Sequence, residues 1–157
     1  MFNSSFKKYF YFLKEEYNSL LYNINMKRWT TSNKAVFNLG YHLIWCSKYR
    51  RDVLADVAVE KRLKQLLLEK AKKIEVEIVT MEVLPDHVHL FVKCSPVDSP
   101  HWIVQQFKGL TSRILRQEFK ALKTRIPTLW TRSYYCESCG HISEATVKKY
   151  IEDQKLA

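Results

Sequence analysis

The sequence predicts an α+β protein whose elements follow one another in the order β-α-β-β-α-β. Two segments carry apolar residues at helical spacing, and four shorter segments are rich in aromatic and branched residues. Such an order is typical of the split βαβ arrangement, an antiparallel sheet with both crossover helices on one face. The length of 157 residues fits one domain. We therefore expect one covered sheet face and one face available for chemistry or a ligand.

The first half of this pattern ends in a turn between two strands. Residues 37–47 (FNLGYHLIWCS) predict a buried strand. A helix is expected over residues 55–73, where Leu and other apolar residues recur at helical spacing. These apolar positions are Val59, Leu63, Leu66, Leu67, Ala71 and Ile74. Residues 75–84 predict the second strand, Pro85-Asp86 the turn, and residues 87–94 the third strand.

The second half repeats a helix and a strand. Ser99-Pro100 is a helix start, an N-cap followed by proline at the first helical position. The apolar stripe expected for this helix is Ile103, Phe107, Leu110, Ile114 and Phe119. Residues 129–136 predict the fourth strand, and Ser143 is expected to cap a last helix that runs to about residue 155. Residues 1–33 keep no clean period, so we divide the chain into an N-terminal extension (1–33) and a folded domain (34–157).

The charge balance favours a polyanionic partner. The chain has 26 Lys and Arg against 16 Asp and Glu, a net charge of +10. Nucleic acid is the simplest partner for such an excess, and a membrane surface is the weaker alternative. No apolar run approaches the roughly 18 residues of a spanning helix. We therefore expect a soluble cytoplasmic protein with no membrane partner.

The stretch LPDHVHLFVKC, residues 84–94, places two histidines at the start of the third strand. Side chains alternate along a strand, so His87 and His89 share one face, about 6.6–7 Å apart along the chain. Val88, Leu90 and the following alternate residues form an apolar face that should contact the helices. Two imidazoles at this spacing can close on one metal ion. The spacing alone favours two half-exposed histidines without metal, because HxH is a very short pattern.

The expected last helix contains a second group of interest. Val147, Tyr150, Ile151 and Gln154 fall on one helical stripe. Periodicity alone favours core packing for Tyr150. The amide of Gln154 argues for a polar partner, because burying it unpaired costs on the order of 1–3 kcal/mol. A metal ion, a phosphate or the Tyr150 hydroxyl would each serve.

Four stretches in order resemble one family: YHLIWCSKYRR at 41–51, PDHVH at 85–89, LWTRSYY at 129–135 and VKKYIEDQ at 147–154. They are similar to the insertion-sequence transposases of the single-tyrosine HUH endonuclease superfamily, over about residues 39–154. HUH denotes histidine, hydrophobic residue, histidine, which His87-Val88-His89 fits. The resemblance implies an RRM-like, ferredoxin-like βαββαβ core with a C-terminal catalytic helix.

The resemblance also implies an activity and a site. Tyr150 matches the family nucleophile, and His87, His89 and Gln154 match the ligands of a divalent ion, Mg²⁺ or Mn²⁺. The implied enzyme is a DNA transposase that cleaves and rejoins single-stranded DNA at the ends of a mobile element through a covalent 5′-phosphotyrosine. It implies subterminal hairpins as substrate, and a homodimer in which the tyrosine helix can act in trans. It further implies a prokaryotic protein associated with the nucleoid.

Basic and aromatic residues are expected to bind the nucleic acid. The basic candidates, which would neutralise phosphates, are Lys48, Arg50, Arg51, Lys108, Arg113 and Arg116. Tyr41, Trp45 and Trp102 are candidates for stacking on unpaired bases, although packing is the better reading for Trp45. Cys136, Cys139 and His141 depart from the small or apolar residues expected before the last helix. They are harmless or form an accessory metal or redox group.

Two other interpretations stay open on the sequence alone. One is a related HUH nuclease, either a replication initiator or a repeat-associated domesticated transposase. The other is a non-catalytic RRM-like module that binds nucleic acid. Such a module would carry stacking aromatics on its central strands, where this chain has His87, His89 and Phe91. That difference favours the enzyme.

Overall fold

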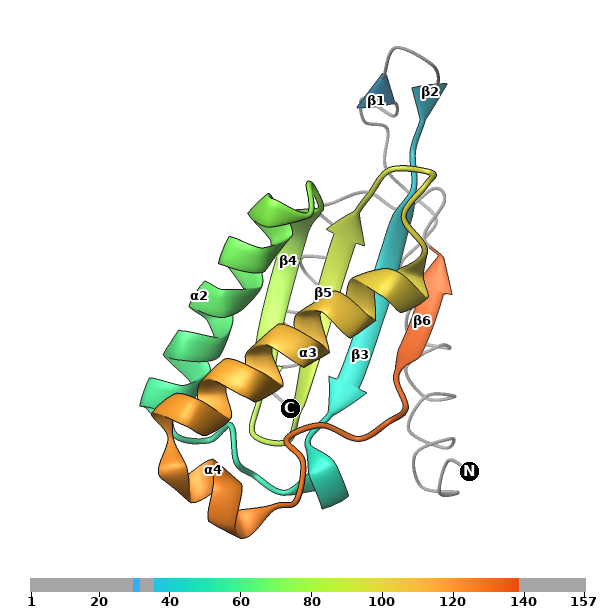
Figure 1. Ribbon diagram of the computed structural model, residues 1–157. Coiled ribbons are helices and arrows are strands. Elements are labelled where there is room, and N and C mark those ends of the chain that lie inside the picture. The colour runs from blue at the N-terminus through green and yellow to red at the C-terminus, as the bar shows by residue number, and fades with distance from the viewer. Residues whose placement is uncertain (1–29, 32–35, 139–157) are drawn as a thin grey trace.

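The computed structural model describes residues 30–31 and 36–138 and contains a four-stranded antiparallel sheet in the order β4-β5-β3-β6 (Figure 1). The strands are β3 (Gly40–Cys46), β4 (Glu77–Leu84), β5 (His87–Lys93) and β6 (Tyr135–Ser138). The helices are α2 (Val57–Lys73), α3 (Pro100–Glu118) and the short α4 (Lys120–Arg125). The predicted α+β fold class is confirmed. The expected last helix lies outside the described residues.

Helices α2 and α3 cover one face of the sheet (Figure 1). Asp56 caps α2 because its carboxylate accepts hydrogen bonds from the backbone N–H groups of Ala58 and Val59. Ser99 caps α3 in the same way, accepting from the N–H of Trp102. The Ser99 cap is where the sequence predicts it, and α2 begins two residues after its expected start at residue 55. The predicted placement of both crossover helices on one face is therefore confirmed.

The core fills the space between these helices and the sheet. On β5 the alternate residues Val88, Leu90 and Val92 are fully buried in it, as the alternation predicts. The predicted stripe of α2 is confirmed from Val59 to Ala71. The buried stripe of α3 is rotated from the expected one. Its members are Ile103, Val104, Phe107, Thr111 and Leu115.

Thr111 explains how a polar residue enters that stripe. Its hydroxyl donates to the carbonyl of Phe107 at 2.7 Å and accepts from the indole N–H of Trp130 at 3.0 Å. With both hydrogen-bonding roles satisfied, the hydroxyl can be buried without a desolvation penalty. The sequence pattern predicts Leu110 and Ile114 at the contact, and these are only partly buried.

The fourth strand begins later than predicted. We expected residues 129–136, whereas β6 spans Tyr135–Ser138. Leu129 and Trp130 are buried in the core instead, and Trp130 forms only an isolated bridge with Ser47. The carbonyl oxygens of residues 131–133 accept hydrogen bonds from the Lys108 ammonium. This segment is therefore anchored to α3 before the chain enters the sheet.

The first strand is also divided. The prediction over residues 37–47 covers β3 and the end of a separate two-residue strand, β2 (Val36–Phe37), which pairs with β1 (Thr30–Thr31). Gly40, the first residue of β3, allows a close approach at this point. A Cβ there would lie 2.8 Å from the Cζ atom of the buried Phe91 ring. The β1–β2 pairing joins residues on the two sides of the expected boundary between residues 33 and 34.

Candidate active site on the histidine face of the sheet

The face of the sheet away from α2 and α3 carries the two histidines of the HxH pattern, and we call it the histidine face. Strand register fixes its members: Ile44 of β3 is opposite His89, and Cys46 is opposite His87. On the outer strands, Glu82 of β4 is opposite His89, and Tyr135 of β6 is opposite Ile44. A third histidine, His42, lies two residues before Ile44 and so belongs to the same face.

The histidine face is buried, which corrects the sequence prediction of an open face. His89 is 0% exposed and His87 only 7%, and Phe91 on the same strand is 2% exposed. The prediction of two half-exposed histidines, made from the spacing alone, is therefore wrong. A buried imidazole needs hydrogen-bonding or metal partners, because leaving its ring nitrogens unpaired costs free energy.

The rings of His87 and His89 lie side by side, with centroids 4.9 Å apart. The Nε2 atom of His89 is buried, and it has no hydrogen-bond partner among the residues that the structure describes. An unpaired buried nitrogen lone pair is what a metal ion would bind. The pair thus fits the predicted half of a metal site.

Each of the two histidines contacts a polar side chain through its Nδ1 atom. The Nδ1 atom of His87 lies 2.5 Å from Oδ1 of Asp86, and the other oxygen of that carboxylate pairs with Nε of Arg50 at 2.6 Å. The Nδ1 atom of His89 lies 3.3 Å from Nε2 of His42, and the two ring centroids are 5.4 Å apart. The remaining nitrogen of each imidazole is Nε2.

Burial keeps His42 and His89 neutral at physiological pH. It lowers the pKa of His42 to about 4. The pKa of His89 is well below its usual value, through burial first and then the proximity of His42 and His87. Burial alone would raise the pKa of Asp86, but hydrogen bonds from His87 and Arg50 outweigh it and hold that pKa at about 2. Neutral imidazole is the form that binds a metal.

A complete site needs a ligand from elsewhere. Within residues 30–31 and 36–138, no group of three His, Cys, Asp or Glu side chains is arranged to hold an ion. Gln154, the predicted third ligand, and Tyr150, the predicted nucleophile, lie outside the described residues. So do Cys139 and His141 of the accessory group, while Cys136 lies on β6 as a free thiol. The described part of the chain supplies the two histidines.

The basic candidates fall into two groups. Lys48, Arg50 and Arg51 follow β3 at the end of the sheet where His87 lies, since Cys46 is opposite His87. Their 3₁₀ turn, η1 (Lys48–Arg50), is held to the Pro85-Asp86 turn by the Ser47 N–H, which donates to the Asp86 carbonyl at 2.8 Å. Arg50 pairs with Asp86, so its charge helps to hold a residue beside the site.

The other three basic candidates lie on α3, in the helix layer across the sheet from the histidines. Lys108 donates to three backbone carbonyls, and Arg116 donates to the carbonyl of Ile126 at 3.1 Å. Arg113 is exposed. Lys108 and Arg116 thus have structural hydrogen bonds that the sequence did not predict.

The aromatic candidates differ in their access to solvent. Trp45 is fully buried and stacks on Phe107, which confirms the packing interpretation. Tyr41 packs against the same core, and Trp102 is 36% exposed. The most exposed large aromatic side chain in the described part of the chain is Tyr49, at 66%, which is not among the stacking candidates named from the sequence.

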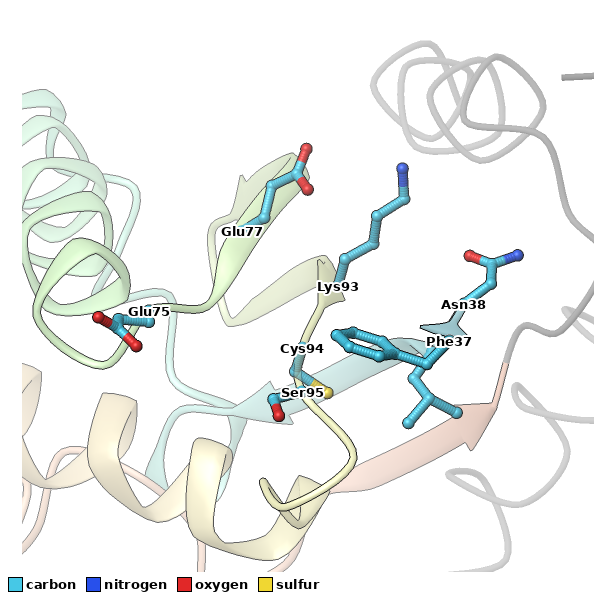
Figure 2. A pocket seen from close by; sticks show the side chains of 8 residues that line it. Phe37, Asn38, Glu75, Glu77, Lys93, Cys94 and Ser95 are labelled. Atoms are coloured by element: carbon cyan, nitrogen blue, oxygen red, sulfur yellow. The ribbon is translucent and has the colours of Figure 1, made fainter. Parts of the chain in front are cut away.

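A hollow of about 160 Å³ lies at the other end of β5, where Lys93 and Cys94 border it (Figure 2). Glu77, the first residue of β4, and Glu75, which precedes that strand, also line the hollow. His87 begins β5 and Lys93 ends it, so the hollow is about 20 Å from His87 along the strand. It is therefore separate from the histidine site.

His42 is the site residue that sequence reasoning missed. It lies in a segment that predicts a buried strand, and nothing in its own spacing distinguishes it from other strand residues. Its contact with His89 joins positions 47 residues apart, and only the register of β3 against β5 reveals it. The usable signal was its place two residues before Ile44, the residue opposite His89, which puts it on the same face as the HxH pair.

Comparison with known proteins decides the family. The family model described as IS200-like transposase matches residues 35–154, most of the chain. The chain belongs to the IS200-like transposase family. The members of this family process DNA, so this transposase is a DNA-processing enzyme.

Two curated transposases are similar to this one in sequence. The ISDra2 transposase TnpA of Deinococcus radiodurans is 38% identical over 121 residues, which cover 76% of this chain and 86% of that protein. The transposase for insertion sequence element IS200 of Salmonella typhimurium is 29% identical over 122 residues, covering 75% of this chain and 78% of that protein.

Solved transposase structures share the fold. A crystal structure of a transposase from Deinococcus radiodurans superposes with a TM-score of 0.66 at 35% identity, covering 80% of this chain and 97% of the other. A REP-associated tyrosine transposase bound to a REP hairpin superposes with a TM-score of 0.57 at 11% identity, covering 85% and 73%. At that identity the second likeness shows the fold alone. Among its described residues this transposase has no helix long and apolar enough to cross a membrane.

Proposed function

We propose that this transposase cleaves and rejoins single-stranded DNA with a divalent metal ion and a tyrosine nucleophile. The observation that carries the proposal is the buried pair His87 and His89, where the Nε2 atom of His89 has no hydrogen-bond partner among the described residues. Membership of the transposase family supplies the DNA substrate and the type of reaction. Gln154 is the proposed third ligand and Tyr150 the nucleophile.

The donor set suits a divalent ion that must polarise a phosphate. Two imidazoles and one amide are neutral ligands, so the ion would keep its full charge for the scissile phosphodiester. Nitrogen donors suit Mn²⁺ somewhat better than Mg²⁺, which prefers oxygen. The burial of His87 and His89 lowers the local dielectric and so strengthens this electrostatic effect.

Tyr150 would perform the bond exchange. Its phenolic oxygen attacks phosphorus and loses its proton, and the bond between phosphorus and the 3′ oxygen breaks. The products are a 5′-phosphotyrosine and a free 3′ hydroxyl, which takes up a proton. A second 3′ hydroxyl can then attack the phosphotyrosine in the reverse direction and join new ends without ATP.

We propose subterminal hairpins as the substrate and a homodimer as the active form. A structural neighbour of the same fold is bound to a REP hairpin, which supports a hairpin ligand for this chain as well. The proposed dimer would allow the predicted helix with Tyr150 to act at the histidines of the partner copy. The charge of +10 favours such a polyanionic ligand.

The proposal predicts a covalent adduct whose position on the DNA is defined. Purified full-length protein is incubated with Mn²⁺ and single-stranded hairpin DNA from a candidate element end, then separated on a denaturing gel. A label at the 3′ end of the DNA should move with the protein, and a label at the 5′ end should be released. EDTA should abolish the adduct, and added Mn²⁺ should restore it.

Two tyrosine variants make the assignment specific. Tyr150→Phe should form no adduct, because it removes the attacking oxygen. Tyr49→Phe is the matched control, since it removes the hydroxyl of an exposed tyrosine that is not the proposed nucleophile, keeps the ring, and should form the adduct as wild type does. An adduct with Tyr150→Phe would show that another residue is the nucleophile. Failure of wild type on all candidate ends would contradict the transposition chemistry proposed here.

A further inference from the structure

We propose that His42 and Asp86 are positioning residues that fix the tautomers of His89 and His87, so that both Nε2 lone pairs face one ion. The inference rests on the proposed function, because it concerns the geometry of the proposed metal ligands. It assigns a role to His42, which no sequence pattern selected. It also assigns Arg50 to the support of Asp86.

The chemistry of imidazole sets the requirement. A neutral imidazole carries one proton, on either Nδ1 or Nε2, and only the other nitrogen can bind a metal. If the ion is to bind Nε2, the proton must be on Nδ1 and needs an acceptor there. Such outer partners orient the ligand ring, and their loss commonly lowers metal affinity by about 10–100-fold.

His87 has this acceptor in Asp86. A carboxylate can only accept hydrogen bonds, so the 2.5 Å contact places the proton on Nδ1 of His87. Arg50 donates its Nε–H to the other oxygen of the same carboxylate at 2.6 Å. The carboxylate is thus held from both sides, and its orientation toward His87 is fixed.

His89 has the corresponding acceptor in His42. The Nδ1 atom of His89 is 3.3 Å from Nε2 of His42, and its own Nε2 atom is the buried one that lacks a partner in the described part of the chain. With the proton on Nδ1, His89 donates to His42 and presents its Nε2 lone pair. The opposite tautomer would bury an N–H donor with nothing described to accept it, at a cost of about 1–3 kcal/mol in general.

The sheet register makes this contact rigid. His42 pairs with Phe91 across β3 and β5, and His89 lies two residues before Phe91, so the two imidazoles are diagonal neighbours on one face. His42 is 4% exposed, and its ring also meets Tyr135 of β6 edge-on, with centroids 6.3 Å apart. A side chain enclosed in this way can hold a ligand ring without moving itself.

The tautomers can be measured in the metal-free full-length protein. Long-range ¹H–¹⁵N correlation spectra of histidine-labelled protein distinguish Nδ1–H from Nε2–H rings. We expect both His87 and His89 to be Nδ1–H in wild type. His42→Leu, which keeps the volume without an acceptor, should change the pattern of His89 and leave that of His87. Asp86→Ala should do the reverse.

Metal affinity is the second readout, measured as Mn²⁺ binding by calorimetry or electron paramagnetic resonance. His42→Leu and Asp86→Ala should each weaken binding by about 10–100-fold. His42→Gln returns a carbonyl acceptor near the same place and should bind close to wild type. His101→Leu removes a histidine on α3 that contacts Tyr134 instead, and its Mn²⁺ affinity should be unchanged.

Circular dichroism melts identify any variant that fails to fold, and the Leu and Gln variants at position 42 are then compared at the same fraction folded. An Nε2–H ring at His89 in wild type would overturn the inference. So would a folded His42→Leu protein that binds Mn²⁺ as tightly as wild type. Wild-type protein that binds no Mn²⁺ at all would overturn the proposed metal site itself, and this inference with it.

Discussion

The histidine site illustrates how much depends on single residues. His89 is completely enclosed, yet one of its ring nitrogens has no hydrogen-bond partner among the described residues. Proteins rarely leave a buried polar atom unpaired without a functional reason. His42 and Asp86 occupy the Nδ1 sides of the two imidazoles. The unpaired atom is therefore the most informative single feature of the site.

Backbone strain beside the site is a second feature at this scale. Tyr49 and Arg50 are consecutive residues with positive φ values of 60° and 51°. The left-handed conformation costs about 1–2 kcal/mol for a residue with a Cβ. Hydrogen bonds from both flanks hold it: the Ser47 hydroxyl donates to the Arg51 carbonyl at 2.7 Å, and the Lys48 N–H donates to the carbonyl of Leu129 at 2.8 Å.

This strain predicts that Tyr49→Gly raises the free energy of unfolding by about 0.5–1 kcal/mol. Glycine removes the Cβ clash at φ 60°, which outweighs its larger chain entropy when unfolded. Arg51→Gly is the matched control, because Arg51 has a φ of −74° and no such strain. It should lower the free energy of unfolding by a similar amount. Urea denaturation of both variants checks this, and equal destabilisation by both would show that Tyr49 is unstrained.

At the scale of elements, Lys108 joins α3 to the segment before β6. Its ammonium donates to the carbonyl oxygens of Thr131, Arg132 and Ser133 at 2.8, 3.3 and 3.2 Å. These residues lead into the strand that carries Tyr135 next to β3. The same ammonium borders a hollow of about 270 Å³ that His101, Arg132 and Tyr134 also line. A lysine expected to bind phosphate thus positions an edge strand.

The burial of Lys108 predicts a stability that rises with pH above about 8. Burial lowers its pKa in the folded protein to about 8, from 10.5 in the unfolded chain. Between these values the unfolded chain binds more protons, so raising the pH favours the folded state. The gain should be about 1–2 kcal/mol, less than the full shift implies, because part of the side chain faces solvent.

The measurement is the free energy of unfolding of wild type and of Lys108→Met from pH 7 to pH 9.5. The difference between them isolates the ammonium. The nearby groups titrate higher, because burial raises the pKa of Cys46 to about 11 and also raises that of Tyr134. The wild-type value should rise relative to the variant across this range. A difference that stays constant with pH would contradict a lowered pKa for Lys108.

Much of the element order could be predicted from the sequence, because it follows from local patterns. The Asp86 turn, the alternation along β5 and the cap at Ser99 are each encoded within a few residues. The shift of the fourth strand was missed because it depends on Lys108, more than twenty residues before β6. Burial of the histidine face was missed because alternation indicates which residues share a face and carries no information about what covers it.

For the candidate site too, the sequence predicts the local features and misses the long-range contact. His87 and His89 follow from a short pattern at a strand start, and their shared face follows from alternation. His42 requires the register of β3 against β5, a contact 47 residues apart in the sequence. The sequence neighbours of His42 are typical strand residues and give no signal of a site. Long-range pairing of this kind is set by tertiary packing, which no local period encodes.

At the scale of the whole molecule, the sheet separates two layers with different tasks. The α2–α3 layer encloses the core, while the other face carries the histidines. Lys48 and Arg51 follow β3 at the end of the sheet where His87 lies. The Lys72–Lys73 pair ends α2, and three residues separate it from the start of β4 at the opposite end of the sheet. The same positive charge is therefore present both near the proposed site and far from it.

This separation predicts that location, and not net charge alone, controls binding of unpaired DNA. The double variant Lys48→Gln/Arg51→Gln should weaken binding of a single-stranded oligonucleotide and reduce the slope of log affinity against log salt by about 1.4, since each lost phosphate contact accounts for about 0.7. Lys72→Gln/Lys73→Gln makes the same change in net charge at the far end of the sheet and should keep nearly the wild-type slope. Fluorescence anisotropy at four or more salt concentrations measures both. Equal slopes for the two double variants would mean that binding responds to total charge. The end of the sheet beside His87 would then not be the preferred contact for the DNA backbone.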